Sequence, residues 1–211
     1  MKLTIVYDND AWQKGLKADW GFSCFVEAHG RELLFDTGAR GSILLSNMKE
    51  LGVDPNRIES IVISHSHWDH VGGLEDLLAL NSCTVFLPTT CREPSGAKEV
   101  VKIKDAGEIY ENIFSTGTLH NMEQSLVVTT ERGAAVIAGC SHPGVRDILG
   151  AAAKFGEVHA LIGGLHGFSD FDLLEGLDLV CPTHCTQHKK RIQELYPDIY
   201  IPGGVGKVIE I

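Results

Sequence analysis

The sequence predicts an α/β fold in which two packed β-sheets carry helices on their outer faces. Short apolar runs typical of strands alternate with helical patterns, and the alternation occurs in both halves of the 211-residue chain. Elements that alternate in this way bury their apolar faces as sheets covered by helices. With 44% hydrophobic and 22% charged residues, the chain suits one globular domain, residues 1–211, that fills a core without disulfide bonds.

In the first half, turn and capping residues delimit the predicted elements. Residues 42–51 form a predicted helix that Ser42 caps and Gly52 ends, and residues 74–80 form another with acidic residues in its first turn. His29-Gly30 is a predicted hairpin turn. The predicted strands are residues 3–8, 22–28, 32–35, 61–64 and 84–88.

The second half repeats the pattern. Gly133 separates two predicted strands, and Gly156 ends a predicted helix over residues 144–155. A last helix is predicted over residues 187–195. The predicted strands of this half are residues 125–130, 134–138, 158–162, 179–180 and 199–200. The glycine-rich segment 203–207 has no helix after it, so it fails as a nucleotide loop and is expected to lead the last strand onto the sheet.

The most informative stretch is Ser64-His65-Ser66-His67-Trp68-Asp69-His70, directly after an apolar strand. It places four potential metal ligands within six residues, followed by a Gly72-Gly73 pair. Imidazole and carboxylate groups are preferred ligands of divalent transition metals. Side chains two apart in an extended segment point the same way, so His65 and His67 can converge on one ion. Asp69 and His70 point differently, which favours a second ion close by.

This His-x-His-x-Asp-His pattern resembles the signature of the metallo-β-lactamase superfamily, whose fold is an αββα sandwich with one or two metal ions at its edge. The resemblance extends to Leu-Leu-Phe-Asp-Thr-Gly at residues 33–38 and to Gly-Cys-Ser-His at residues 139–142. Further matches, at residues 123–128, 162–166, 183–186 and 204–206, are similar to the branch named after the archaeal 7,8-dihydropterin-6-yl-methyl-4-(β-D-ribofuranosyl)aminobenzene 5'-phosphate synthase.

The resemblance and the ligand chemistry together imply a two-ion site. His65 and His67 are the expected ligands of the first ion, and Asp69, His70 and His184 those of the second. His142 is the preferred third ligand of the first ion, with His120 as its rival. Cys140 stands where relatives carry a bridging Asp or a Cys, and it is either a thiolate ligand or an inert buried thiol.

Two further residues are expected to support the site. Asp36 follows a strand, so its carboxylate is expected to orient a ligand imidazole or the ligand loop, with a plain turn residue as the alternative. His166 lies in a glycine-flanked loop, where an imidazole can contact an anionic group or shuttle a proton. Asp69 and His166 are therefore the candidate catalytic residues.

The six cysteines are expected to be free thiols or a metal ligand, and not a disulfide framework. Cys24, Cys83 and Cys91 lie in or beside strand-like runs and are expected to be small buried hydrophobic residues. Cys181 and Cys185 flank Pro182 and His184, but no second cysteine pair completes a zinc knuckle there.

The expected chemistry is hydrolysis or group transfer by a metal-bound water or hydroxide on a small anionic substrate that contains an ester, lactone or phosphate. The cofactors are expected to be two divalent ions, zinc first, with manganese or iron as alternatives. His67 favours non-redox work, because the di-iron branch carries Glu at the corresponding position. The alternatives are a metal-containing small-molecule binding or regulatory protein with little turnover and a di-iron oxygen or nitric oxide reductase.

Charge and hydropathy limit the expected partners and location. The net charge of −10 argues against nucleic acid, because basic residues cluster only at residues 189–191 and at Lys102 with Lys104. No apolar run is long enough to span a bilayer, and the strand-like start is unlike a signal peptide. We therefore expect a cytoplasmic enzyme with a small-molecule substrate and no nucleic-acid or membrane partner. The sequence leaves its oligomeric state open.

Overall fold

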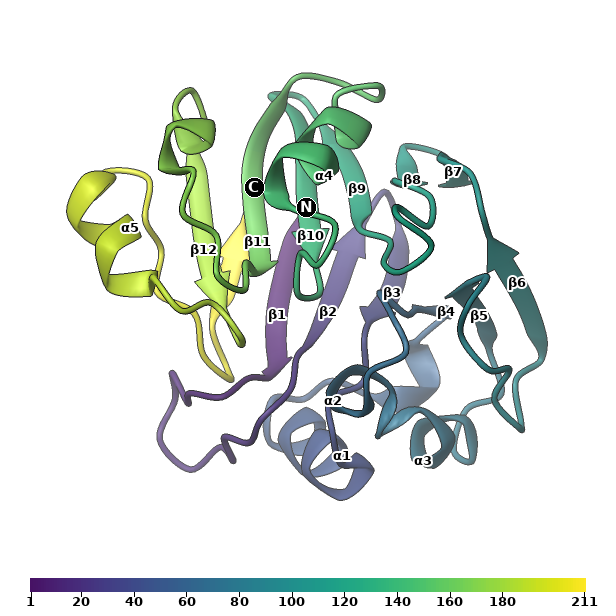
Figure 1. Ribbon diagram of the computed structural model, residues 1–211. Coiled ribbons are helices and arrows are strands. Elements are labelled where there is room, and N and C mark those ends of the chain that lie inside the picture. Colours follow the sequence, from purple (N-terminus) through teal and green to yellow (C-terminus); the bar gives the residue numbers. More distant parts are fainter.

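Two β-sheets face each other in the middle of the molecule, and helices cover the outer face of each (Figure 1). The computed structural model describes residues 1–211. This four-layer αββα arrangement confirms the fold class predicted from the alternation of strands and helices.

The first sheet has seven strands in the order β13-β1-β2-β3-β4-β5-β6. The strands β3, β4, β5 and β6 run parallel, whereas β13, β1, β2 and β3 pair antiparallel. Because parallel strands end at the same edge, the loops after β3 and β4 lie together. The bounds are β1 Lys2–Tyr7, β2 Ser23–Ala28, β3 Arg31–Phe35, β4 Ser60–Val62, β5 Thr84–Pro88, β6 Glu99–Ile103 and β13 Val208–Glu210.

The second sheet has six strands in the order β12-β11-β10-β9-β8-β7. Here β10, β11 and β12 run parallel, so the loops after these three strands also meet at one edge. The bounds are β7 Gly107–Tyr110, β8 Ile113–Ser115, β9 Leu126–Thr130, β10 Gly133–Ala138, β11 Val158–Gly164 and β12 Leu179–Thr183.

The helices divide between the two outer faces. Residues of β1, β3, β4 and β5 pack against α1 and α3, while residues of β10, β11 and β12 pack against α4 and α5. The short helix α2 forms the second part of the ligand loop. The bounds are α1 Gly41–Glu50, α2 Trp68–Val71, α3 Leu74–Leu78, α4 Val145–Ala152 and α5 Lys189–Leu195, with 3₁₀ turns η1 Pro55–Arg57 and η2 Phe171–Leu174.

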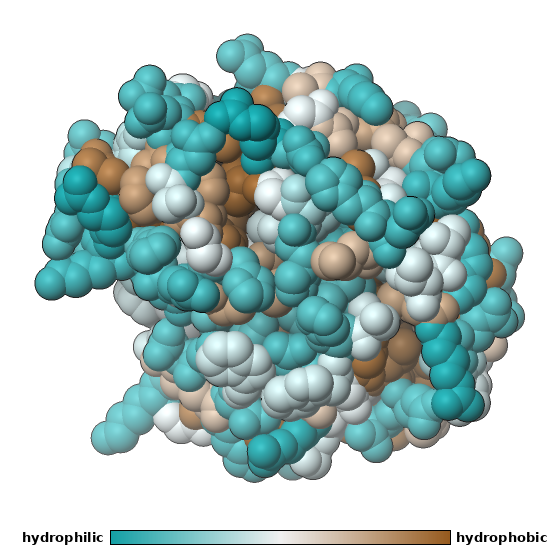
Figure 2. Space-filling model, in the orientation of Figure 1, coloured by the Kyte–Doolittle hydropathy of each residue, from teal (hydrophilic) through white to brown (hydrophobic).

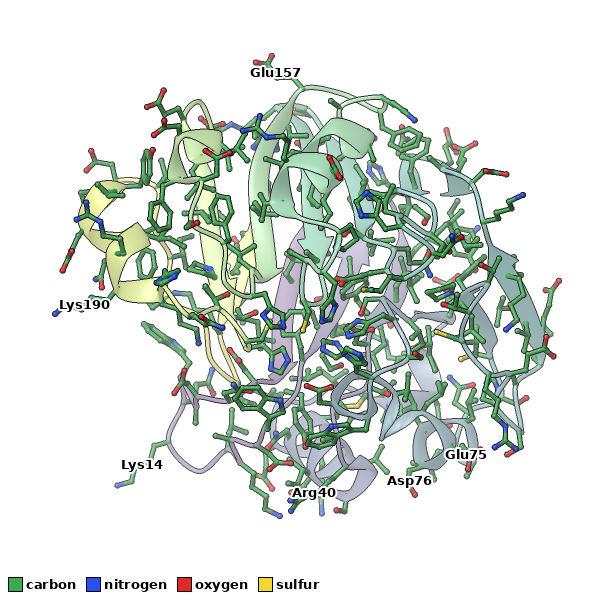
Figure 3. The ribbon with its side chains drawn as sticks, in the orientation of Figure 1. Lys14, Arg40, Glu75, Asp76, Glu157 and Lys190 are labelled. Atoms are coloured by element: carbon green, nitrogen blue, oxygen red, sulfur yellow. The ribbon has the colours of Figure 1, made fainter.

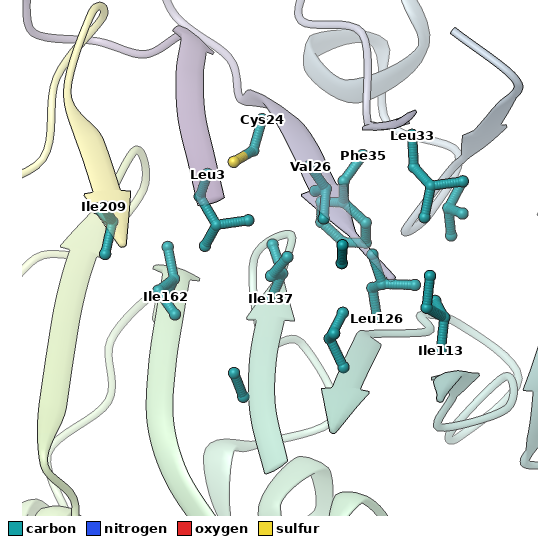
Figure 4. Packing of buried hydrophobic residues seen from close by; sticks show 14 of the residues in the cluster. Leu3, Cys24, Val26, Leu33, Phe35, Ile113, Leu126, Ile137, Ile162 and Ile209 are labelled. Carbon is teal, nitrogen blue, oxygen red and sulfur yellow. The ribbon is translucent and has the colours of Figure 1, made fainter. Parts of the chain in front are cut away.

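The central core lies between the facing sheets (Figure 4). Leu3, Val26 and Phe35 from the first sheet pack against Leu126 and Ile137 from the second, and all five side chains are fully buried. Burying such side chains supplies the main driving force for folding and fixes the two sheets against each other. The edges at which the loops meet are therefore held in one place.

Several sequence predictions need correction. The N-cap of α1 is Arg40, without a side-chain hydrogen bond, and Ser42 lies inside the first turn, so it does not cap the helix. Residues 199–200 form no strand, because only an isolated bridge joins Tyr200 to Val180. Helix α4 ends at Ala152, short of the predicted residue 155. The strands β6, β7 and β8 were not predicted.

No helix combines the length and apolar character that crossing a membrane requires.

Candidate metal centre

The predicted ligands gather where the carboxyl-terminal edges of the parallel strands of both sheets meet. His65 and His70 follow β4, Cys140 and His142 follow β10, and His184 follows β12. Two groups of side chains have their ligand atoms within 4.8 Å of one another: His65, Cys140 and His142, and His70, Cys140 and His184. The structure thus brings together residues from both halves of the chain.

The first group is built on the extended part of the ligand loop. His65 Nε2 lies 2.9 Å from His67 Nδ1, and the two rings meet edge to face. The ring of His142 lies 4.6 Å from that of His65 and 4.8 Å from that of His67, measured between centroids. Two nitrogens bound to one tetrahedral zinc ion lie about 3.4 Å apart, so these three imidazoles are close enough to share an ion.

Glu123 holds His142 and the preceding turn in place. Its carboxylate is fully buried and accepts four hydrogen bonds. Two come from His142, from the backbone nitrogen at 3.0 Å and from Nδ1 at 2.8 Å. The backbone nitrogens of Cys140 and Ser141 donate the others, at 2.8 and 3.0 Å. Because Nδ1 is engaged in this way, Nε2 of His142 is the nitrogen free to bind a metal.

The second group includes His70, which lies in the short helix α2. His70 Nε2 lies 3.2 Å from Cys140 Sγ, and His184 Nε2 lies 3.3 Å from Asp69 Oδ2. Both separations are close to those between two ligands of one ion. Asp69 therefore adjoins this group beside His184.

Cys140 belongs to both groups, which is the position that its interpretation as a thiolate ligand requires. Its thiol is buried between the histidines of the two groups and can contribute to either.

His120, the rival of His142, lies away from the centre: its side chain is 59% exposed and its Nε2 pairs with Asp147 at 2.9 Å. His142 is thus the better placed of the two.

Asp36 orients the ligand loop, as expected from its position after β3. One carboxylate oxygen accepts from the Ser64 backbone nitrogen at 2.7 Å. The other accepts from the Ser64 hydroxyl at 2.7 Å and lies 2.6 Å from His70 Nδ1. With Nδ1 held in this way, His70 presents Nε2 to the metal position. Ser64 Oγ also lies 2.9 Å from His65 Nδ1, so this small network reaches both groups.

Burial keeps the ligand imidazoles in the form that binds metals. Burial lowers the pKa of His65 and of His70 to about 3, so both rings are neutral at pH 7 and offer a lone pair. Burial would raise the pKa of Asp69, but the neighbouring His184 and His70 hold it below its usual range. The adjacent Cys185 thiol and burial together raise the pKa of Cys140. A bound metal ion favours the deprotonated thiol.

One buried atom indicates that a ligand belongs in the second group. His184 Nδ1 lies 2.9 Å from Asn9 Oδ1, whereas the buried Nε2 makes no hydrogen bond and has Asp69 Oδ2 3.3 Å away. A buried polar atom without a partner is costly. A divalent metal ion at this position satisfies Nε2, and the surrounding nitrogen, sulfur and oxygen donors are those that zinc prefers. The residues present therefore fit a metal ion.

Four non-glycine residues of the site have the left-handed backbone conformation. The φ angles are 56° at Asp36, 63° at Ser141, 48° at His166 and 44° at His184. Such residues are uncommon and carry local strain that the surrounding structure must balance. Each follows the end of a strand, where the chain changes direction sharply beside the ligands.

His166 lies beside the first group. Its ring centroid is 5.0 Å from that of His142, and its side chain is exposed to solvent. It lines a cavity of about 350 Å³ together with Ser141, Arg146, Leu165 and Phe168. A second cavity, of about 380 Å³, reaches Ser66 of the ligand loop from the side of α3. Figure 2 shows hydrophobic surface on this face both toward α3 and between α4 and α5.

The remaining cysteines are free thiols. Cys24, Cys83 and Cys91 are buried among apolar side chains, as expected. Cys181 packs in the core between the sheets, whereas Cys185 Sγ lies against the Cys140 carbonyl, so the two do not form a zinc knuckle.

Three residues that support the site were not assigned a role from the sequence. Glu123 was noted only within the family match at residues 123–128, and Trp20 was given no role. Asn9 carried no signal. Glu123 lies in the buried run Glu123-Gln124-Ser125, and an acidic residue in a buried run is the one local sign that could have marked it.

Comparison with known proteins places the chain in a family. Residues 21–167 match the model of the metallo-beta-lactamase superfamily, which is more than half of the chain. The protein therefore belongs to the metallo-β-lactamase superfamily, as the ligand pattern indicated.

Individual relatives span nearly the whole chain. The 7,8-dihydropterin-6-methyl-4-(beta-D-ribofuranosyl)-aminobenzene-5'-phosphate synthase of Methanocaldococcus jannaschii is 25% identical in an alignment that covers 87% of this chain and 84% of the relative. Tm1679, a metal-dependent hydrolase of the beta-lactamase superfamily, is 26% identical with a TM-score of 0.83 and covers 100% of this chain and 99% of its own. Zn(2+)-bound PqqB from Methylobacterium extorquens, 11% identical with a TM-score of 0.64 and 100% coverage of both chains, shows the same fold.

Proposed function

We propose that this protein is a metal-dependent hydrolase that acts on a small anionic substrate with an ester, lactone or phosphate centre. The observation that carries the proposal is the pair of ligand groups that share Cys140 and include the unpartnered Nε2 of His184. The likeness to Tm1679, a metal-dependent hydrolase, supports it.

The ligand assignment follows the two groups. His65, His67 and His142 are the proposed ligands of one ion, and Asp69, His70 and His184 those of the other, with Cys140 available to both. When bound, such ions lower the pKa of a water molecule and polarise the substrate oxygen. We propose zinc first, because the donors are mainly imidazoles with one thiol.

Residues of this chain position the substrate beside that centre. The cavity behind His166 begins next to His142, so a substrate whose reacting group lies at the ligands can extend into it. Burial lowers the pKa of His166, and the nearby His142 adds to the effect. A neutral imidazole there donates a hydrogen bond through one nitrogen and accepts through the other. We therefore propose that His166 contacts the polar group of the substrate and passes protons to or from it.

Group transfer is a second candidate activity. Its support is the 25% sequence identity to the Methanocaldococcus jannaschii synthase, in an alignment that covers 87% of this chain. The same centre can activate an organic hydroxyl or amine as acceptor in place of water, since the demands on the ligands are the same.

A turnover screen on the metal-loaded protein tests these proposals. The substrates are phosphodiesters, lactones, thioesters and phosphoribosyl compounds, each with and without an organic acceptor, and metal content is measured in parallel. We expect turnover in at least one class that chelation removes and zinc restores. His65→Ala should lose it, whereas His188→Ala, an exposed histidine outside the centre, should retain it. Bound zinc with no metal-dependent turnover in any class would instead favour a binding protein, and iron in place of zinc would favour redox chemistry.

A further inference from the structure

The second ligand group is covered by the segment between β1 and β2, residues 8–22. This segment leaves the sheet as a long loop, and the labelled Lys14 marks its outer side (Figures 1 and 3). The segment returns to the centre at both of its ends. Asp8 and Asn9 lie at the start of the loop, and Trp20 and Gly21 lie at its end.

Trp20 contacts two of the proposed ligands of the second ion. Its indole Nε1 donates a hydrogen bond to Asp69 Oδ2 at 2.8 Å. Its ring also meets the ring of His184 edge to face, with centroids 5.2 Å apart. The indole is 51% exposed, so one face of it is open to solvent while its polar edge is engaged.

The start of the same segment fixes His184. Asp8 Oδ1 accepts from the His184 backbone nitrogen at 2.8 Å, which holds the left-handed backbone of that residue. Asn9 Oδ1 lies 2.9 Å from His184 Nδ1 and also accepts from the Gly21 backbone nitrogen at 3.1 Å. Asn9 thereby links the two ends of the segment beneath the second group.

The first group has no contact of this kind. His65 is held by Ser64, and His142 is held by Glu123, both outside the segment. The Asp36–Ser64 network reaches both groups, whereas segment 8–22 holds His184 and Asp69 and makes no hydrogen bond to His65 or His142.

We propose that Trp20 is a positioning residue for the second metal ion: it orients the Asp69 carboxylate so that the affinity of this ion, and not of the first, depends on segment 8–22. An indole nitrogen only donates, so Trp20 holds the carboxylate without competing for the metal. Partners of this kind change metal affinity by about 10- to 100-fold. The inference rests on the two-ion centre proposed above.

Calorimetric titration of the chelator-treated protein with Zn²⁺ tests this directly. We expect two equivalents to bind the wild-type protein. Trp20→Phe keeps an aromatic ring but removes the donor, so the dissociation constant of one of the two equivalents should rise about 10- to 100-fold while that of the other stays within about twofold. Trp20→His restores an N–H donor and should recover part of the affinity. Trp12→Phe is the matched control, because Trp12 lies in the same segment, is similarly exposed and packs against Lys207 instead.

Fluorescence gives a second readout that needs no activity. The chain has three tryptophans, so the double variant Trp12→Phe/Trp68→Phe leaves Trp20 as the one indole emitter. Its emission should change with only one of the two equivalents of Zn²⁺, the one whose affinity Trp20→Phe lowers. If wild type and Trp20→Phe bound Zn²⁺ with equal affinities, or if both equivalents were weakened equally, the role proposed for Trp20 would be contradicted and the two-ion centre would not. A wild-type protein that binds fewer than two equivalents would contradict the two-ion centre and this inference with it.

Discussion

Replacing Glu123 with glutamine should destabilise the metal-free protein in a way that depends on pH. The buried carboxylate accepts four hydrogen bonds from residues 140–142, and these bonds, above all the one from His142, outweigh the effect of burial and lower its pKa from the ordinary 4.5 to about 2. By linkage, a difference of this size corresponds to about 3 kcal/mol of folding free energy. The glutamine side chain carries no charge, and its NH₂ group, which is itself a donor, would face the N–H donors of residues 140–142.

The direction of the pH dependence follows from the lowered pKa. A carboxylate whose pKa is lower in the folded state contributes its full stabilisation above pH 4.5 and loses it as the pH falls toward 2. Urea unfolding with EDTA present should therefore show Glu123→Gln about 3 kcal/mol less stable than wild type at pH 7, and the difference should fall below half that value by pH 3.

The exposed Glu131 provides the control. Glu131→Gln should change the unfolding free energy by less than about 0.5 kcal/mol at either pH. If Glu123→Gln cost less than about 1 kcal/mol at pH 7, or cost the same at pH 3 as at pH 7, the role given to this carboxylate would be wrong.

Three further predictions concern the metal, the ligand loop and the glycines. Removing metal with EDTA should lower the melting temperature and adding Zn²⁺ should restore it, because an ion at 100 times its dissociation constant stabilises the fold by about 2.7 kcal/mol; an unchanged melting curve would contradict a structural contribution. Asp36→Asn should weaken zinc binding by about 10- to 100-fold in a chelator competition, since it alters the acceptor of His70 Nδ1. Gly150→Ala, in open space on α4, should raise the unfolding free energy by about 0.5–1 kcal/mol. Gly163→Ala should lower it in the same assay, because its φ is 124° and the new methyl would lie 1.9 Å from the Ala138 carbonyl oxygen.

Local patterns in the sequence predicted the parts of the fold and site that local physics determines. The alternation of strands and helices, the ligand loop at residues 65–70 and Asp36 after its strand all depend on neighbours in the chain. The prediction that Ser42 caps α1 was nevertheless wrong, because Arg40 is the N-cap residue and Ser42 already lies within the first turn of the helix. Strands β6 and β7 have mixed, partly exposed side chains, so their pattern does not stand out from a loop.

Contacts between distant residues could not be predicted in the same way. Asn9 and His184 are 175 residues apart, and Trp20 and Asp69 are 49 apart. Nothing in the local pattern around Asn9 or Trp20 marks it as a partner of a metal ligand, because the pairing exists only after both sheets have formed. The shared position of Cys140 is of the same kind: its neighbours in sequence suggested a ligand, but its place between the two groups follows from how the sheets pack.

That shared position has a mechanical consequence. A metal ion held jointly by His70 and Cys140 closes a loop of 70 residues and cross-links the first sheet to the second. Cross-links that join distant residues restrict the unfolded chain most. The ions would then hold the two sheets together at the edge where their loops meet. Removing the ions should therefore weaken the contact between the sheets before either sheet unfolds by itself.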